Sequence, residues 1–308
     1  DPGYTGGDVF TYDICDIDDD CDTGMVDVII EDPCIDLTLW VYLEGSLVNV
    51  NDGTYETISN PGPLNPAYMR TSLNDLGLLP GQVNTFYGQS DIYNPFGQPY
   101  DAAPWSYLGT EGDVYDSGGV NTAPARFAGY DSTVTDWVLV SLRTNPEDGS
   151  EALCQRAGLL HSDGHIEFVS EADCCDLDAS QSYYIVVEHR NHLIVMSDAP
   201  VPVVDGNLTY DFRFQDSYLN DPVGLGGFYS QKEVSPGIFA MYAGNGDQTS
   251  STASDTDFNT SDYTKWLNNG LEFRTYNFTD YNMSGDRNAN DFELWQTNSP
   301  RNTTVKRD

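Results

Sequence analysis

A twelve-residue stretch near the C-terminus carries the side chains best suited to chemistry. From Asp280 to Asp291, oxygen-bearing side chains stand at positions 1, 3, 5 and 12, and Gly285 stands at position 6. A calcium loop needs this spacing, because alternate residues of a tight loop converge on one ion, the glycine permits the sharp turn, and position 12 closes the shell from a helix. A polar turn without an ion is the alternative. The predicted Ca2+ ligands are Asp280, Asn282, Ser284, the backbone carbonyl of Asp286 or of its neighbour, and Asp291.

An internal repeat strengthens the calcium hypothesis. Asp262–Trp266 and Asp291–Trp295 share the frame Asp-aromatic-x-x-Trp, and each is expected to start a short helix whose dipole favours the acid. The loop before Asp262 is longer than a standard one, so its register stays open. Asp at position 12 departs from the EF-hand and resembles the dockerin-type loop, without implying a dockerin's partner binding. The ligands proposed for a second ion are Asp247, Asp255, Asp257, Asn259 and Asp262.

Residues 1–33 are predicted to form a β-hairpin. Alternating residues 9–14 and 25–30 flank an acidic turn, which we expect to be solvated or, alternatively, to hold another ion. The pattern resembles the last two strands of Ig-like or cadherin-like repeats in large bacterial surface proteins. That resemblance implies an incomplete domain, completed elsewhere in a longer chain or on another subunit. It is carried by Gly3, Gly6, Asp8, Phe10, Thr11, Tyr12, Ile14, Cys15 and Asp16, then by Cys21, Asp22, Thr23, Val26 and Val28.

Six cysteines, an even number without a CxxC pair, indicate an exported and oxidised protein. Cys15 and Cys21 can bridge the mouth of the hairpin turn. A vicinal bridge between Cys174 and Cys175 is strained, so these two are expected to pair with Cys34 and Cys154 in an order the sequence leaves open.

Many short alternating segments with little helix predict a mainly β fold. We expect an antiparallel Ig-like or prealbumin-like sandwich with a small α-containing calcium-binding C-terminal region. Strands are predicted at 35–45, 137–142, 152–161, 166–169, 183–189, 194–196 and 208–214, with a short helix near 73–78. The expected domains are the hairpin at 1–33, the central β-sandwich at 34–216, and a dockerin-like paired calcium-loop region at 217–308.

The chain from Cys34 onward also resembles a module near the C-termini of large Bacteroidetes surface proteins that are exported by the type IX route. These proteins are multidomain and mostly of unassigned function, so the resemblance implies secretion or a cell-surface location and no activity. Its motifs are residues 40–45, 76–80, 103–105, 109–111, 136–140 and 187–193.

The charge of −36, from 49 acids against 13 bases, argues against nucleic acid and anionic membranes as partners. No apolar stretch approaches the roughly 20 residues of a membrane helix. The same acidity favours divalent cations as counterions.

No sequence frame for catalysis stands out, and no catalytic residue is predicted. Motifs for nucleophilic Ser, zinc proteases and phosphate loops are absent from the sequence. The pairs His161/His165 and His189/His192 flank turns, where backbone groups are expected to satisfy them, although a metal or general-base role is conceivable. Trp40, Trp105 and Trp137 are expected in the core rather than on a carbohydrate platform.

These observations favour a non-enzymatic extracellular structural or adhesive protein, a subunit of a cell-surface or extracellular filament. Expected partners are further copies, as a homo-oligomer or head-to-tail polymer in which residues 1–33 dock on a neighbour, and possible glycans or other cell-surface proteins. The alternative is a carbohydrate-binding accessory module of a secreted multidomain enzyme. A third hypothesis, a hydrolase, requires a cleft with two facing carboxylates.

Overall fold

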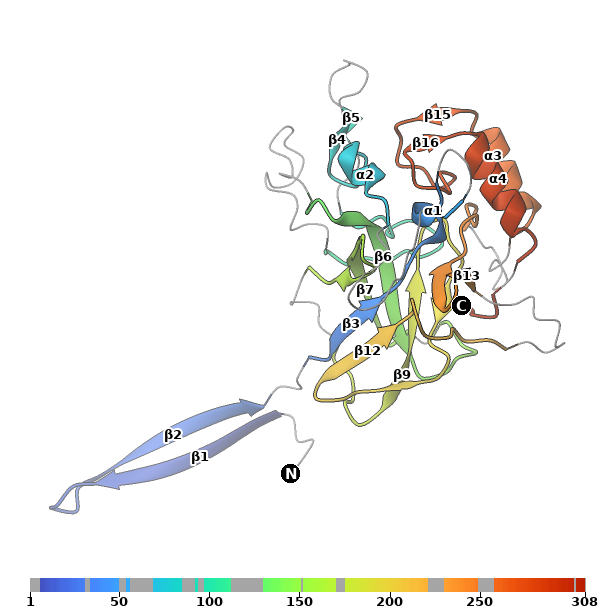
Figure 1. Ribbon diagram of the computed structural model, residues 1–308. Helices are drawn as coiled ribbons and strands as arrows, with labels where there is room; N and C mark the ends of the chain where they lie inside the picture. The colour runs from blue at the N-terminus through green and yellow to red at the C-terminus, as the bar shows by residue number, and fades with distance from the viewer. Residues whose placement is uncertain are drawn as a thin grey trace.

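The computed structural model consists of a projecting two-stranded arm and a mainly β body (Figure 1). Strands make up 37% and helices 12% of it, which confirms the predicted mainly β class. It describes residues 6–30, 34–49, 54–55, 69–84, 92–93, 97–111, 130–150, 152–169, 175–220, 230–248, 258–301 and 303–307.

The arm is the predicted hairpin of β1 (Gly6–Cys15) and β2 (Cys21–Ile30). The two strands pair antiparallel in one unbroken register, from Gly6 opposite Ile30 to Cys15 opposite Cys21. A disulfide joins Cys15 to Cys21 at the turn. Figure 1 shows the arm pointing away from the body, with this turn at its far end.

The body is built on an antiparallel six-stranded sheet. Its strand order is β10-β9-β6-β7-β8, and β11 also pairs with β9. Strand β6 lies at the centre and is buried along its whole length, as its apolar run predicts. The bounds are β6 (Val134–Arg143), β7 (Cys154–His161), β8 (Ile166–Glu167), β9 (Ser182–Glu188), β10 (Val195–Met196) and β11 (Val201–Pro202).

A second pair of strands, β3 (Asp36–Trp40) and β12 (Asn207–Asp211), packs across this sheet. Its ladder is parallel, which the expected antiparallel sandwich did not anticipate. Leu37 and Leu39 point inward and share one apolar core with β6 and β9. The predicted strand 35–45 also ends early, because Glu44–Leu47 forms the short buried helix α1.

The C-terminal region packs on the same body. Met241 and Met283 belong to the main core, so described residues on both sides of the predicted 216/217 boundary share that core, and the three-domain division stays a prediction. The remaining elements are α2 (Ser72–Asp75), β4 (Val83–Asn84), β5 (Ile92–Tyr93), β13 (Gln231–Ser235), β14 (Ile238–Met241), α3 (Thr260–Asn268), β15 (Glu272–Phe273), β16 (Asp286–Arg287) and α4 (Ala289–Asn298).

A second disulfide joins Cys154 at the start of β7 to Cys175. Cys34 is also disulfide-bonded, and Cys174 lies outside the described residues. The structure thereby decides part of the pairing that the sequence left open. Across the described helices, none has the length and apolar character that crossing a membrane requires.

Candidate calcium sites

The loop from Asp280 to Asp291 is closed by its own first and last carboxylates. Asp280 accepts the backbone N–H groups of Ser284 and Gly285 at 3.0 and 2.8 Å. Asp291 accepts those of Asn282 and Asn288 at 3.0 and 2.8 Å. Gly285 adopts a left-handed φ of 88°, the sharp turn expected of position 6. The structure therefore brings the predicted first, third, fifth and twelfth positions of the loop together.

Both carboxylates of this loop are fully buried. Burial raises the pKa of Asp280 to about 6, although the charges of Arg190 and Arg70 oppose the shift. Burial and the neighbouring charge of Asp280 raise the pKa of Asp291 well above its usual value. Two buried acids that resist ionisation side by side form a site in which a divalent cation would favour the charged forms.

A second loop, from Asn245 to Asp262, repeats this arrangement. Asp262 accepts the N–H groups of Gly246 and Asp247 at 2.8 and 3.1 Å, and that of Asn259 at 2.9 Å. Asp262 is fully buried, and burial, followed by the charge of Asp247, raises its pKa to about 8. Asn245 Oδ1 and Asp247 Oδ1 are buried and have no hydrogen-bond partner among the described residues. Unpartnered oxygens beside a buried acid suit a hard cation.

The two loops meet their helices through the same capping box. Asn259 caps α3 with Asp262 at the third helical position, and Asn288 caps α4 with Asp291 there. When the two loops are aligned on these capping boxes, Asp247 corresponds to Asn282 and Asn245 corresponds to Asp280. The sequence interpretation missed Asn288 and gave Asn245 no role, although an Asn three residues before each Asp was the available signal.

Some predicted ligands do not face the loop interiors. The Asp286 side chain accepts the backbone N–H of Arg274 at 2.9 Å, while its carbonyl accepts the Ser284 hydroxyl at 3.2 Å. The carbonyl is the group that the sequence predicts as the ligand, so this side-chain contact leaves the prediction unchanged. The side chain of Asn259 is engaged as the helix cap. Asp255 and Asp257 lie outside the described residues.

The donor set of each loop is mixed. Within the described ranges, no group of three or more His, Cys, Asp or Glu side chains is placed to hold a metal. Of its described residues, each loop places at most two carboxylates at the site, and the other oxygens come from amides, a hydroxyl and the backbone. Such oxygen-only sets are typical of calcium and poorly suited to transition metals.

The loops are anchored to the body by buried donors. Asn191 Nδ2 donates to the carbonyl of Asp280 at 2.6 Å, and Arg70 donates to the carbonyl of Asn282. Gln248 Nε2 donates to the carbonyls of His192 and Asn245 at 3.1 and 2.9 Å. Ordering of the loops by an ion would consequently stabilise the body as well.

Behind this anchor lies a buried ionic network that the sequence did not reveal. Arg190 Nε and His189 Nε2 lie 2.9 and 3.1 Å from Asp136 Oδ2, and the Tyr276 hydroxyl donates to Asp136 Oδ1 at 2.7 Å. Burial alone would raise the pKa of Asp136, but Arg190 and the hydrogen bonds from His189 and Tyr276 outweigh it and lower the pKa to about 2.

The expectation for His189 and His192 needs correction. Their rings are buried and lie 2.8 Å apart at Nδ1, so they are parts of this network rather than turn residues satisfied by backbone alone. Burial lowers the pKa of both histidines. His161 and His165 do flank the predicted turn, since His161 N donates to the carbonyl of His165.

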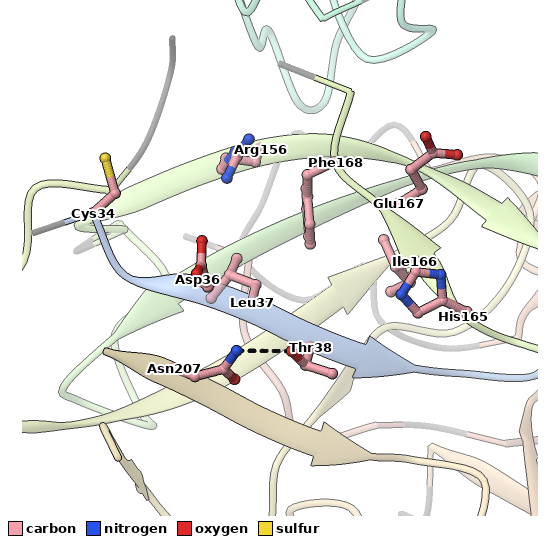
Figure 2. Close-up of a pocket in the computed structure, with 10 residues that line it drawn as sticks. All are labelled: Cys34, Asp36, Leu37, Thr38, Arg156, His165, Ile166, Glu167, Phe168 and Asn207. Carbon is pink, nitrogen blue, oxygen red and sulfur yellow. Dashed lines mark hydrogen bonds between the residues drawn. The ribbon is translucent and has the colours of Figure 1, made fainter. Parts of the chain in front are cut away.

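A groove of about 540 Å³ lies between β3 and β8 (Figure 2). Two acids line it, but Figure 2 shows them apart, with Asp36 near Cys34 and Glu167 toward His165. Glu167 is 2.9 Å from His161 Nε2. The described residues of this groove thus offer no facing pair of carboxylates.

Two of the three tryptophans expected in the core, Trp105 and Trp137, are buried, whereas Trp40 lies outside the core clusters. Trp137 is fully buried, Trp105 is 8% exposed, and Trp40 is half-buried beside His165. Trp266 and Trp295 pack with Tyr263 and Phe292 between α3 and α4, at ring distances of 5.2–6.3 Å. The repeat's aromatic residues therefore hold the two helices together.

Comparisons of the chain with protein-family models, curated proteins and solved structures find no significant match. The function must accordingly be argued from the geometry.

We expect Asp280→Asn to abolish most of the thermal stabilisation that calcium gives to the loop from Asp280 to Asp291, because it removes a charged ligand. Asp286→Asn removes the same charge from the same loop, but its side chain faces Arg274. This control should keep the calcium response. Calorimetric titration with Ca2+ distinguishes the two, and equal losses in both variants would contradict the assignment.

Proposed function

We propose that the protein is a non-enzymatic structural subunit of an extracellular or cell-surface filament, stabilised by calcium and disulfides. The observation that carries the proposal is the unpartnered hairpin of β1 and β2. Within the described part of the chain these strands pair only with each other, and most of their residues are exposed. A lone hairpin is marginally stable in water, so this one needs a partner surface.

The two faces of the arm differ. Phe10, Tyr12 and Ile14 lie on one face of β1 and are 52%, 44% and 65% exposed. The strand register places Val26 and Val28 of β2 on that same face. Asp8 and Asp22 border this face, whereas the opposite face has no aromatic residue and carries Val9, Asp13, Met25 and Asp27. An apolar face of this extent is typical of an interaction surface, and a docked arm would bury it on a neighbouring subunit.

The resemblance to exported surface proteins and the Ig-like character of the sandwich are part of this proposal. An arm that completes its sheet on the next subunit would link copies head to tail, since donor and acceptor surfaces differ. The disulfides suit an oxidising compartment. The burial of Trp105 and Trp137 gives the competing carbohydrate-binding hypothesis no aromatic platform at those positions.

Deleting residues 1–32 should abolish assembly and leave dispersed subunits, because the arm is the proposed link. The measurement is light scattering of the purified chain in calcium-containing buffer, together with the melting temperature as a check on folding.

A milder pair of variants sharpens this test. Phe10→Ser with Ile14→Ser removes apolar area from the proposed contact face, whereas Val9→Ser alters the opposite face. Loss of assembly only in the first variant supports arm docking. Intact polymers without residues 1–32 would rule it out.

A further inference from the structure

A small cavity of about 260 Å³ lies on the outer face of the central sheet, where the C-terminal tail crosses it. Ser141 and Arg143 of β6 and Val186 of β9 face it, and Val305 packs on Val186 beside it. Its volume is below the roughly 300–1,000 Å³ of small-molecule sites. A side chain inserted from another protein suits this size better than a free ligand.

The cavity concentrates positive charge in a very acidic protein. Three of the 13 basic residues, Arg143, Lys306 and Arg307, line it. Arg307 Nε binds Glu188, which also accepts the indole N–H of Trp105. Lys306 lies 3.4 Å from Glu147, and both side chains are nearly half exposed, so this pair is weak.

Arg143 is the unusual member of the group. It is 2% exposed, and its Nε and Nη2 donate to the Met196 thioether at 3.3 and 2.9 Å, while Nη1 donates to the carbonyl of Lys306. Thioether sulfur is a weak acceptor. No carboxylate of a described residue lies within ion-pair distance, and burial lowers the pKa of the guanidinium. A buried charge of this kind gains from a carboxylate partner.

The turn of the arm carries carboxylates, whose negative charge is opposite to that of the basic residues in the cavity. Asp16, Asp18, Asp19 and Asp20 stand between the disulfide-bonded Cys15 and Cys21, with no basic residue among them. Asp16 accepts the N–H groups of Asp18 and Asp20 and so holds the turn. The side chains of the other three acids are exposed and accept no hydrogen bond from described residues. They are presented on a covalently closed tip.

We propose that the acidic tip of one subunit, Asp18–Asp20, docks into the Arg143–Lys306 cavity of a second copy. This inference rests on the proposed filament function and names its acceptor site. The tip lies at the far end of the arm, and the C-terminus lies on the body (Figure 1). Donor and acceptor are therefore different surfaces, as an open polymer requires. Pairing them also relieves part of the repulsion between highly acidic copies.

The test compares two triple variants of the full chain. Asp18→Asn with Asp19→Asn and Asp20→Asn removes the tip charge. The strand variant, Asp13→Asn with Asp27→Asn and Asp36→Asn, removes equal charge from β1, β2 and β3, away from the tip and from the apolar face of the arm. The tip variant should raise the concentration at which assembly begins by at least about tenfold. The strand variant should not, since it leaves the tip intact.

A charge exchange and a zero-length cross-link complete the test. Lys306→Glu should weaken assembly, and adding Asp19→Lys should restore it. Carbodiimide treatment of wild-type polymers should join Lys306 to Asp18, Asp19 or Asp20 between subunits, as peptide mass spectrometry would show. Polymers in which the tip triple behaves like the strand triple, without this cross-link, would overturn the acceptor site alone. A wild-type chain that never assembles would overturn the filament proposal itself.

Discussion

We expect calcium chelation to lower the melting temperature of the protein by roughly 5–15 °C, and added calcium to restore it. The basis is mass action: an ion present at 100–1,000 times its dissociation constant stabilises the folded state by about 2.7–4.1 kcal/mol, and for a chain of this size each kcal/mol shifts the melting temperature by about 2–4 °C. The loops are anchored to the body through Asn191, Arg70 and Gln248. The loss should therefore appear in the main unfolding transition.

The calcium effect should also grow with pH. The pKa of Asp280 in the folded state is about 6 and that of Asp262 about 8, both above the unfolded value near 3.9. Without calcium, the folded state then binds more protons than the unfolded state between about pH 4 and 8, so its stability falls as pH rises through that range. Calcium would bind the ionised carboxylates. The rise in the melting temperature of the protein on adding calcium should therefore be larger at pH 8 than at pH 5.

Differential scanning calorimetry at both pH values, with calcium or chelator, measures this prediction. Magnesium at equal concentration is the matched control, because it demands a tighter octahedral shell and binds such loops less well. An unchanged melting temperature on chelation would contradict every calcium assignment in the molecule.

The substitution Asp136→Asn should destabilise the protein by about 3–5 kcal/mol, the usual cost of removing one partner of a buried ion pair. Arg190 and Asp136 are both fully buried, and His189 and Tyr276 depend on the same carboxylate. The variant would leave a buried guanidinium whose Nη2 already has no hydrogen-bond partner in the described part of the chain. Urea unfolding followed by tryptophan fluorescence gives the change in the free energy of unfolding.

Two further variants provide reference values for this loss in the free energy of unfolding. Glu147→Gln breaks the half-exposed pair with Lys306 and should cost no more than about 1 kcal/mol. Tyr276→Phe removes one hydrogen bond to Asp136 and should cost about 1–3 kcal/mol, which keeps the protein foldable if Asp136→Asn does not fold. Similar small losses in all three would show that the network contributes little.

The sequence predicts the loops better than their surroundings, and the reason is distance along the chain. Calcium-type spacing from Asp280 to Asp291 is local, so ligand chemistry and turn geometry are both legible in twelve residues. Asp136 and His189 are 53 residues apart, and no periodic pattern in the sequence predicts their contact.

Strand pairing shows the same limit. Alternation predicts β3 and most of β12, but it does not indicate that Leu37 pairs in parallel with Leu208, which lies far away along the sequence. The arm is the reverse case, since its two strands are neighbours in sequence and their register follows from one turn.

The strong acidity has a physical role in this account. Part of it closes the two loops, and part stands at the tip of the arm, where repulsion between copies must be screened or neutralised before they join. Assembly should consequently weaken in low salt with chelator, since both bridging and screening are removed.

Negative-stain electron microscopy of the purified full chain tests the central claim most directly. In calcium-containing buffer of physiological ionic strength, the account predicts linear filaments in which each subunit's arm reaches the next, and dispersed particles once a chelator is added at low salt. Dispersed single subunits in both buffers would contradict it.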